Sequence, residues 1–116
     1  MNLNKILKTI KGNDANMSFP SQEEISSGAK ETIKNVLLNC LASYPVKKDK
    51  QIFVVNTLAT NILNSDGEIE FSKDEISFLK EVLYKTTFRE EEDGKEKGVY
   101  LPFMIGQVLL ELGIKE

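Results

Sequence analysis

The chain of 116 residues has no histidine, no tryptophan and one cysteine, Cys40. The absence of histidine removes the side chain that most often acts as general base, metal ligand or pH switch. A single cysteine excludes both an intramolecular disulfide and a thiolate zinc site. No apolar run is long enough to span a bilayer or to form a signal peptide with a cleavage site. We therefore expect a cytoplasmic protein without a membrane partner.

The sequence also lacks the motifs of catalysis. It has no phosphate-binding loop, no dinucleotide fingerprint and no nucleophile with a recognisable base. The acidic pair Glu68 and Glu70 is better explained as a solvated strand face than as a general acid and base, because no second functional group accompanies it. We expect no enzyme, no catalytic or cofactor-binding residues, no metal site and no cofactor.

Arginine occurs once, as Arg89, and the net charge is −3. Because arginine is the main reader of base edges and a strong phosphate clamp, this composition argues against nucleic acid as the partner. One alternative stays open, a small nucleic-acid-binding regulator that uses a basic patch. The lysines of that patch are Lys47, Lys48 and Lys50, with Lys30 and Lys34 as further candidates.

Hydrophobic periodicity predicts a mainly α-helical fold, a compact bundle of four to five helices in a single domain over residues 1–116. At the start, apolar residues at helical spacing predict a short amphipathic helix that ends near Gly12. These residues are Leu3, Ile6, Leu7 and Ile10. Residues 12–20 are turn-rich, so residues 1–20 can form an N-terminal arm. This arm either packs on its own domain or docks on a partner.

Two apolar patterns in the middle of the chain predict longer helices. A stripe over residues 33–44 ends before Pro45, which cannot continue a helix. Cys40 lies within this stripe, and we interpret it as a buried small hydrophobe. Residues 52–63 carry apolar side chains over half of the helix circumference or more. A face that wide predicts the central helix of the fold.

Two capping boxes predict where helices begin. Ser21 and Glu24 fit the pattern, although the Ser-Ser-Gly that follows moves the expected helix start towards Ala29. Ser72 and Glu75 form a stronger box before a second apolar stripe. Each box pairs a hydroxyl with an early backbone amide, and the glutamate with the amide of the capping residue.

The second half of the chain predicts a small antiparallel ribbon and a last helix. Residues 68–71 alternate in polarity and residues 98–101 are β-prone, so we expect them to pair. Residues 89–98 are almost all charged or glycine and predict an exposed loop. Pro102 suits the first turn of a helix, and residues 103–112 point apolar side chains nearly all round. A helix of that kind is central or shared with another subunit.

The acidic segment Asp66–Glu75 resembles a calcium-binding loop at first sight. A frame that starts at Asn64 places Asp66, Glu68 and Glu75 at ligand positions three, five and twelve. Position six is then Ile69, where the tight turn of such a loop requires glycine. If the frame is moved so that a glycine stands at position six, no carboxylates remain at the first and last ligand positions. We favour a turn, strand and helix cap, with an acidic metal-responsive helical module as an open alternative.

The order of these segments resembles small, uncharacterised proteins of tailed bacteriophages and prophages. The centre, Asp66 to Lys80, reads Asp-Gly-Glu-Ile-Glu-Phe-Ser-Lys-Asp-Glu-Ile-Ser-Phe-Leu-Lys, and Pro102 to Leu110 closes the chain with Pro, apolar residues and Gly-Gln. The similarity covers about residues 30–112. It implies a viral accessory protein, located in the host cytoplasm or in the virion, and transfers no functional residues.

The Asp66–Glu75 segment is also similar to the centre of tellurite-resistance TerB-like helical domains. That family repeats acidic ligand positions on two helices. No second acidic cluster of this type is present in the sequence, which puts a shared metal site in doubt.

We therefore expect a non-enzymatic phage-type accessory protein that acts by protein–protein contact, as an assembly component or a host counter-defence factor. Its partners would be another protein and further copies of itself, since the all-round apolar last helix favours self-association. The expected interaction residues are Leu3, Ile6, Leu7, Ile10, Phe103, Leu110 and Ile114.

Overall fold

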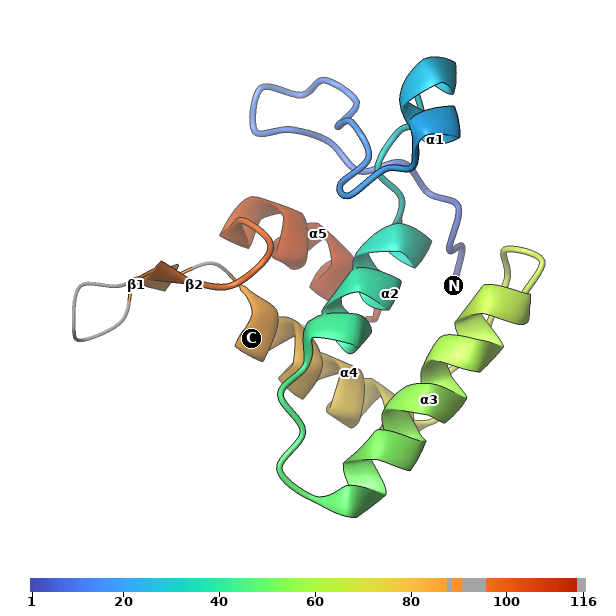
Figure 1. The fold of residues 1–116 in the computed structure, drawn as a ribbon, viewed down its shortest axis with the longest axis vertical. Helices are drawn as coiled ribbons and strands as arrows, with labels where there is room; N and C mark the ends of the chain where they lie inside the picture. The colour runs from blue at the N-terminus through green and yellow to red at the C-terminus, as the bar shows by residue number, and fades with distance from the viewer. Residues whose placement is uncertain (88, 91–95, 115–116) are drawn as a thin grey trace.

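The structure, a computed structural model, describes residues 1–87, 89–90 and 96–114 (Figure 1). This part of the chain is mainly helical, which confirms the predicted fold class at that level. In chain order, the elements are α1 (Gln22–Ser27), α2 (Ile33–Ser43), α3 (Asp49–Asn64), α4 (Lys73–Thr86), β1 (Arg89–Glu90), β2 (Glu96–Lys97) and α5 (Pro102–Glu111).

Helix α2 forms the centre of the fold, and α3 and α4 both pack against it (Figure 1). Its inward stripe is completely buried or nearly so, and consists of Ile33, Val36, Leu37, Cys40 and Leu41. The prediction that residues 52–63 form the central helix is wrong. Helix α3 contacts the rest of the fold along one side, so only Leu58 and Ile62 are buried there.

Local capping chemistry sets the helix ends as expected. Both capping boxes form, with the hydroxyls of Ser21 and Ser72 accepting from backbone amides three residues later. The expected shift of the first helix towards Ala29 is wrong. Gly28 takes a left-handed conformation (φ 68°) and ends α1, and Thr32 then caps α2 separately. Pro102 occupies the first turn of α5, as predicted.

The predicted ribbon between residues 68–71 and 98–101 is wrong. Glu68 bridges to Asn2, and Tyr100 bridges to Thr87. The described antiparallel strands are instead β1 and β2, with Arg89 opposite Lys97. They lie inside the charged segment expected to be a loop, of which residues 91–95 lie outside the described part. The N-terminal segment takes up the backbone hydrogen-bonding groups of residues 67–69, so these residues are not available to pair with residues 98–101.

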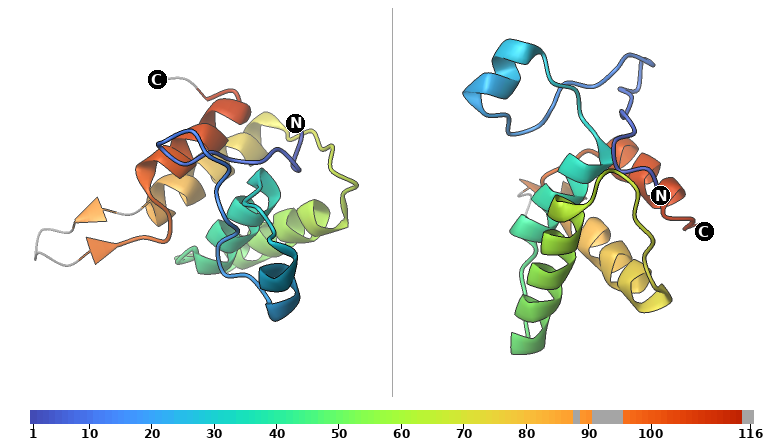
Figure 2. Two further views of the ribbon diagram at one scale, coloured as in Figure 1. Left: turned by 90° about the horizontal axis from the view of Figure 1, so that it is seen from above. Right: turned by 90° about the vertical axis from the view of Figure 1, so that its right-hand side faces the viewer.

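The N-terminal arm, residues 1–20, is not helical where a helix was predicted. It runs in extended and turn conformations above the N-terminal end of α2 (Figure 2). The amide of Leu3 donates to the carbonyl of Gly67 at 2.7 Å, and the amide of Leu7 donates to that of Glu31 at 2.9 Å. Leu3 and Leu7 are thereby fully buried in the core. Long-range pairing satisfies more of the arm's backbone hydrogen-bonding groups than one short helical turn would.

Candidate interaction surfaces

The outward face of α5 carries an apolar stripe, defined here as Phe103, Gly106 and Leu110. These residues recur at i, i+3 and i+7 and so lie on one side of the helix. Ile105 and Val108 point the other way and are buried against the core. Leu110 is 67% exposed and Phe103 is 45% exposed. The predicted all-round apolar helix is thus divided between a core face and a surface face.

The stripe forms one wall of an open groove of about 770 Å³ between α4 and α5. Tyr84, Leu109 and Ile114 add to the apolar lining of this groove, together with Pro102. The sequence from Gly98 to Leu110 contains no charged residue. An uncharged, apolar and exposed surface is the kind of surface that another protein chain covers.

The structure joins the N-terminal arm to the edge of this stripe through Gln107. Its side-chain oxygen accepts from the amide of Lys8 at 2.8 Å, and its side-chain nitrogen donates to the carbonyl of Lys8 at 2.8 Å. Lys5 and Glu111 form an ion pair beside it. No sequence pattern pointed to Gln107, because one amide among apolar residues has no distinctive spacing.

The seven predicted interaction residues divide into two groups in the structure. Leu3 and Leu7 lie in the core and not on a surface. The other five reach solvent wholly or in part, and are Ile6, Ile10, Phe103, Leu110 and Ile114. Phe103, Leu110 and Ile114 line one groove, while Ile10, 80% exposed, lies at a turn of the arm.

Sequence reasoning missed a buried carboxylate, Glu31, which is fully shielded from solvent. One oxygen accepts from the amide of Ser18 at 3.0 Å, and the other accepts from the side chain of Asn35 at 2.5 Å. The Asn35 amide also donates to the Ser18 carbonyl at 3.1 Å. This network attaches the arm to the start of α2. Glu31 follows Lys30 in a polar stretch, so the sequence resembles an exposed surface at this point.

Cys40 and Tyr100 are buried behind this network. Burial raises the pKa of the Cys40 thiol to about 11, and burial also raises the pKa of Tyr100 to about 12. The side chain of Asn39 donates to the Tyr100 hydroxyl at 2.9 Å. Both groups are protonated at neutral pH, and the complete burial of Cys40 confirms its interpretation as a core residue.

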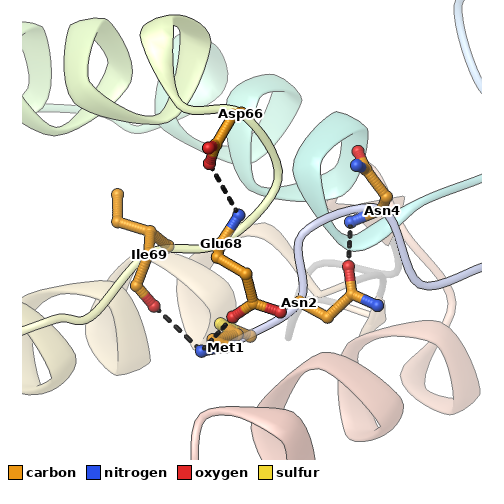
Figure 3. Close-up of polar contacts among 6 residues, drawn as sticks. All are labelled: Met1, Asn2, Asn4, Asp66, Glu68 and Ile69. Carbon is orange, nitrogen blue, oxygen red and sulfur yellow. Dashed lines mark hydrogen bonds and ion pairs between the residues drawn. The ribbon is translucent and has the colours of Figure 1, made fainter.

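The acidic segment makes local structural contacts, some of them with the start of the chain (Figure 3). A carboxylate oxygen of Asp66 accepts from the amide of Glu68 at 3.4 Å. The amino group of Met1 donates to the carbonyl of Ile69 at 2.9 Å and forms an ion pair with Glu68 at 3.4 Å. Gly67, which lies between Asp66 and Glu68 in the sequence, has a φ of 117°. A side chain there would also collide with Asn4.

The remaining polar side chains of the calcium-like frame act in the helix cap. Ser72 and Glu75 exchange hydrogen bonds with each other's backbone amides at 3.2 and 2.8 Å. Within the described residues, no three His, Cys, Asp or Glu side chains gather so that they could hold a metal ion. The metal-responsive module around Asp66–Glu75 stays a prediction, which a calcium titration monitored by thermal melting can test.

The lysines of the alternative basic patch are spread over the molecule. Lys47, Lys48 and Lys50 are exposed at the start of α3. Lys34 instead donates to the carbonyl of Leu63, the penultimate residue of α3, at 3.3 Å. Lys30 donates to Asn16 in the arm at 3.0 Å. A nucleic-acid contact would therefore rest on the three lysines near the α3 start, and it stays a prediction.

No protein-family model matches this chain, and neither a curated protein nor a solved structure shows significant similarity to it. None of the described helices has the length and apolar composition that a membrane crossing needs. The fold and surfaces thus define a small helical protein with an exposed, uncharged apolar groove.

Proposed function

We propose that the protein is a non-enzymatic accessory protein of phage or prophage type that acts through contact with other protein chains. Its role would be that of an assembly component or a counter-defence factor. The phage setting rests on the resemblance of residues 30–112, and the contact role rests on the apolar stripe of α5. The stripe is the observation that carries the proposal.

A second copy of the chain is the occupant that this stripe fits. In a two-fold symmetric contact the same surface patch of each copy meets its counterpart, so two patches with charges of one sign would repel each other. The region from Gly98 to Leu110 has no charge, although the whole chain has a net charge of −3. Gly106 lies between Phe103 and Leu110, and its lack of a side chain lets two α5 helices approach closely. The stripe is therefore suited to a symmetric dimer.

Substitution of the stripe tests this contact. Leu110→Glu would bury an unpaired charge in an apolar contact, a desolvation cost that salt does not remove, and should convert a dimer into a monomer. Because Leu110 is 67% exposed, the variant should keep its melting temperature when measured as a monomer. Sedimentation velocity in about 0.5 M salt is the appropriate assay, because charge contacts are screened there while apolar contacts persist.

Ile25→Glu on α1 is the matched control, since Ile25 is another exposed apolar residue far from α5. This variant should sediment as the unaltered protein does. A wild-type chain that stays monomeric, or a Leu110→Glu chain that stays dimeric, contradicts the proposed contact. Fractionation of phage particles from producing cells then separates the two roles, because an assembly component should copurify with particles or their precursors.

A further inference from the structure

A second apolar groove, of about 510 Å³, lies between the first half of α3 and the start of α4. Phe53, Val54 and Leu58 form its α3 wall, and Phe78 lies on the α4 side. Phe53 is 72% exposed. Phe78 is held in place by an edge-to-face contact with Tyr44, with ring centroids 5.4 Å apart. The groove is thus an apolar surface with a rigid floor.

The α4 side of this groove is acidic. Asp74 and Phe78 are four residues apart on α4 and both line the groove, so an exposed carboxylate lies beside the aromatic ring. Glu75 adds a second carboxylate at the groove, and its capping hydrogen bond fixes its position. On the α3 side, Asp49 and Lys50 precede Phe53 and Val54 by one turn, so their charges offset each other there. The groove fits an apolar group that carries a positive charge on its α4 side.

The turn of the N-terminal arm has that chemistry. The amide of Gly12 donates to the carbonyl of Thr9 at 2.9 Å, and the amide of Thr9 donates to that of Asn13 at 2.7 Å. An ion pair between Lys8 and Asp14 braces the two sides of the turn.

Ile10 and Lys11 project from this turn. Ile10 is 80% exposed, and Lys11 beside it is also exposed. Lys11 makes no ion pair within the described residues. The turn thus presents an apolar side chain next to a free positive charge.

The arm and the groove lie at opposite ends of the molecule. The arm is at the upper end of the longest axis, and the first halves of α3 and α4 are at the lower end (Figures 1 and 2). The two surfaces therefore cannot meet within one chain, but they can meet between chains arranged head to tail.

We propose that the Ile10 turn of one copy inserts into the α3–α4 groove of the next copy. Ile10 contacts Phe53 and Phe78, and Lys11 approaches Asp74 and Glu75. Charge complementarity between the basic turn and the acidic wall carries the assignment of a second copy as occupant. The contact is heterologous, so each added copy retains one free turn and one free groove. Assembly by this contact proceeds to a closed ring or an open filament, and it uses a surface separate from the α5 stripe.

The test is a charge exchange in the Leu110→Glu background, which removes the α5 contact, at about 50 mM salt so that charge contacts act over a longer range. The background protein should form oligomers whose size grows with concentration. Lys11→Glu or Asp74→Lys alone should weaken this association by about tenfold, since each places like charges opposite each other. The double variant Lys11→Glu/Asp74→Lys should restore it, because the reversed charges again attract.

Apolar substitutions separate the contact from general electrostatic attraction. Ile10→Ser and Phe53→Ser should each abolish growth of the oligomer, while Ile25→Ser on α1 should leave it unchanged. All of these side chains are exposed, so folding is preserved. Three results overturn the proposal: a background protein that stays monomeric, single charge variants that associate normally, or a double variant that stays weak. A monomeric chain whose groove instead binds a synthetic Leu/Lys helical peptide, lost on Phe53→Ser, assigns the groove to a foreign partner.

Discussion

The N-terminal arm and helix α3 have similar apolar content, but they differ in which apolar side chains are buried. The arm has no helix, yet Leu3 and Leu7 are completely buried. Helix α3 spans 16 residues and buries only Leu58 and Ile62, while Phe53 and Leu63 are exposed. The segment that suggested a detachable arm contributes two fully buried core residues, and the segment that suggested the centre of the fold leaves much of its apolar surface exposed.

The difference shows that backbone pairing decided burial at these two places. The arm pairs with Gly67, Glu31 and residues 33–34, which fixes its side chains against α2. Helix α3 satisfies its own backbone internally and needs only one buried side to dock on α2. Its remaining apolar surface is therefore available for contact with another chain.

The largest expected effect compares the same substitution in the two regions. Leu3→Ala should lower the free energy of unfolding by about 2–5 kcal/mol, because it opens a cavity at a fully buried site. Leu63→Ala on α3, where the side chain is 59% exposed, should cost less than about 1 kcal/mol. Urea unfolding of both variants measures the two values. Equal losses would show that the arm is not part of the core.

The next largest loss of stability is expected at Glu31, the buried carboxylate that attaches the arm to the start of α2. Glu31→Ala leaves the amide of Ser18 without its acceptor and removes one of the two acceptors of the Asn35 side chain, at a cost of about 2–4 kcal/mol. Glu31→Gln keeps one acceptor oxygen and should cost less. Hydrogen exchange of the arm amides, followed in both variants, should show the arm opening before α2. Arm amides that stay protected in the alanine variant would contradict this role.

Alkaline pH should weaken the central helix on which both regions pack. The pKa of Cys40 is about 11 in the fold, above the 9.0 of an exposed thiol, so folding favours the protonated form. Its contribution to stability is complete below pH 9 and is lost as the pH rises through 11, a loss of roughly 2–3 kcal/mol. Melting temperatures from pH 8 to 11 should fall less steeply for Cys40→Ala than for the wild type.

The loop after α3 should be sensitive to substitution at Gly67, where the N-terminal arm packs against it. Gly67 has a φ of 117°, which L side chains rarely adopt, and a Cβ atom there would collide with the side-chain nitrogen of Asn4. Gly67→Ala should therefore cost about 1–3 kcal/mol in unfolding free energy. Asn4→Ala combined with Gly67→Ala removes the collision and leaves the backbone strain, so the double variant should recover part of the loss. A single variant as stable as the wild type would contradict the positive φ at Gly67.

Local interactions account for what the sequence could predict. The capping boxes at Ser21 and Ser72 and the stripe of α2 depend on residues three or four apart, so they can be read directly. The predicted ribbon failed because Glu68 pairs with Asn2, far away in sequence. The last helix is apolar nearly all round in sequence, so periodicity did not separate the exposed Phe103 and Leu110 from its buried face. Glu31 and Gln107 act through contacts with the arm that no spacing reveals.

The smallest expected effect on stability is at Phe53. Phe53→Ser should change the unfolding free energy by less than about 0.5 kcal/mol, because a ring that is 72% exposed loses little on removal. Phe78→Ser across the same groove should cost more, since that ring packs on Tyr44. Urea unfolding of both variants at low protein concentration measures the difference without association. A large loss at Phe53 would make α3 a core element after all, and the contrast between the arm and α3 would then disappear.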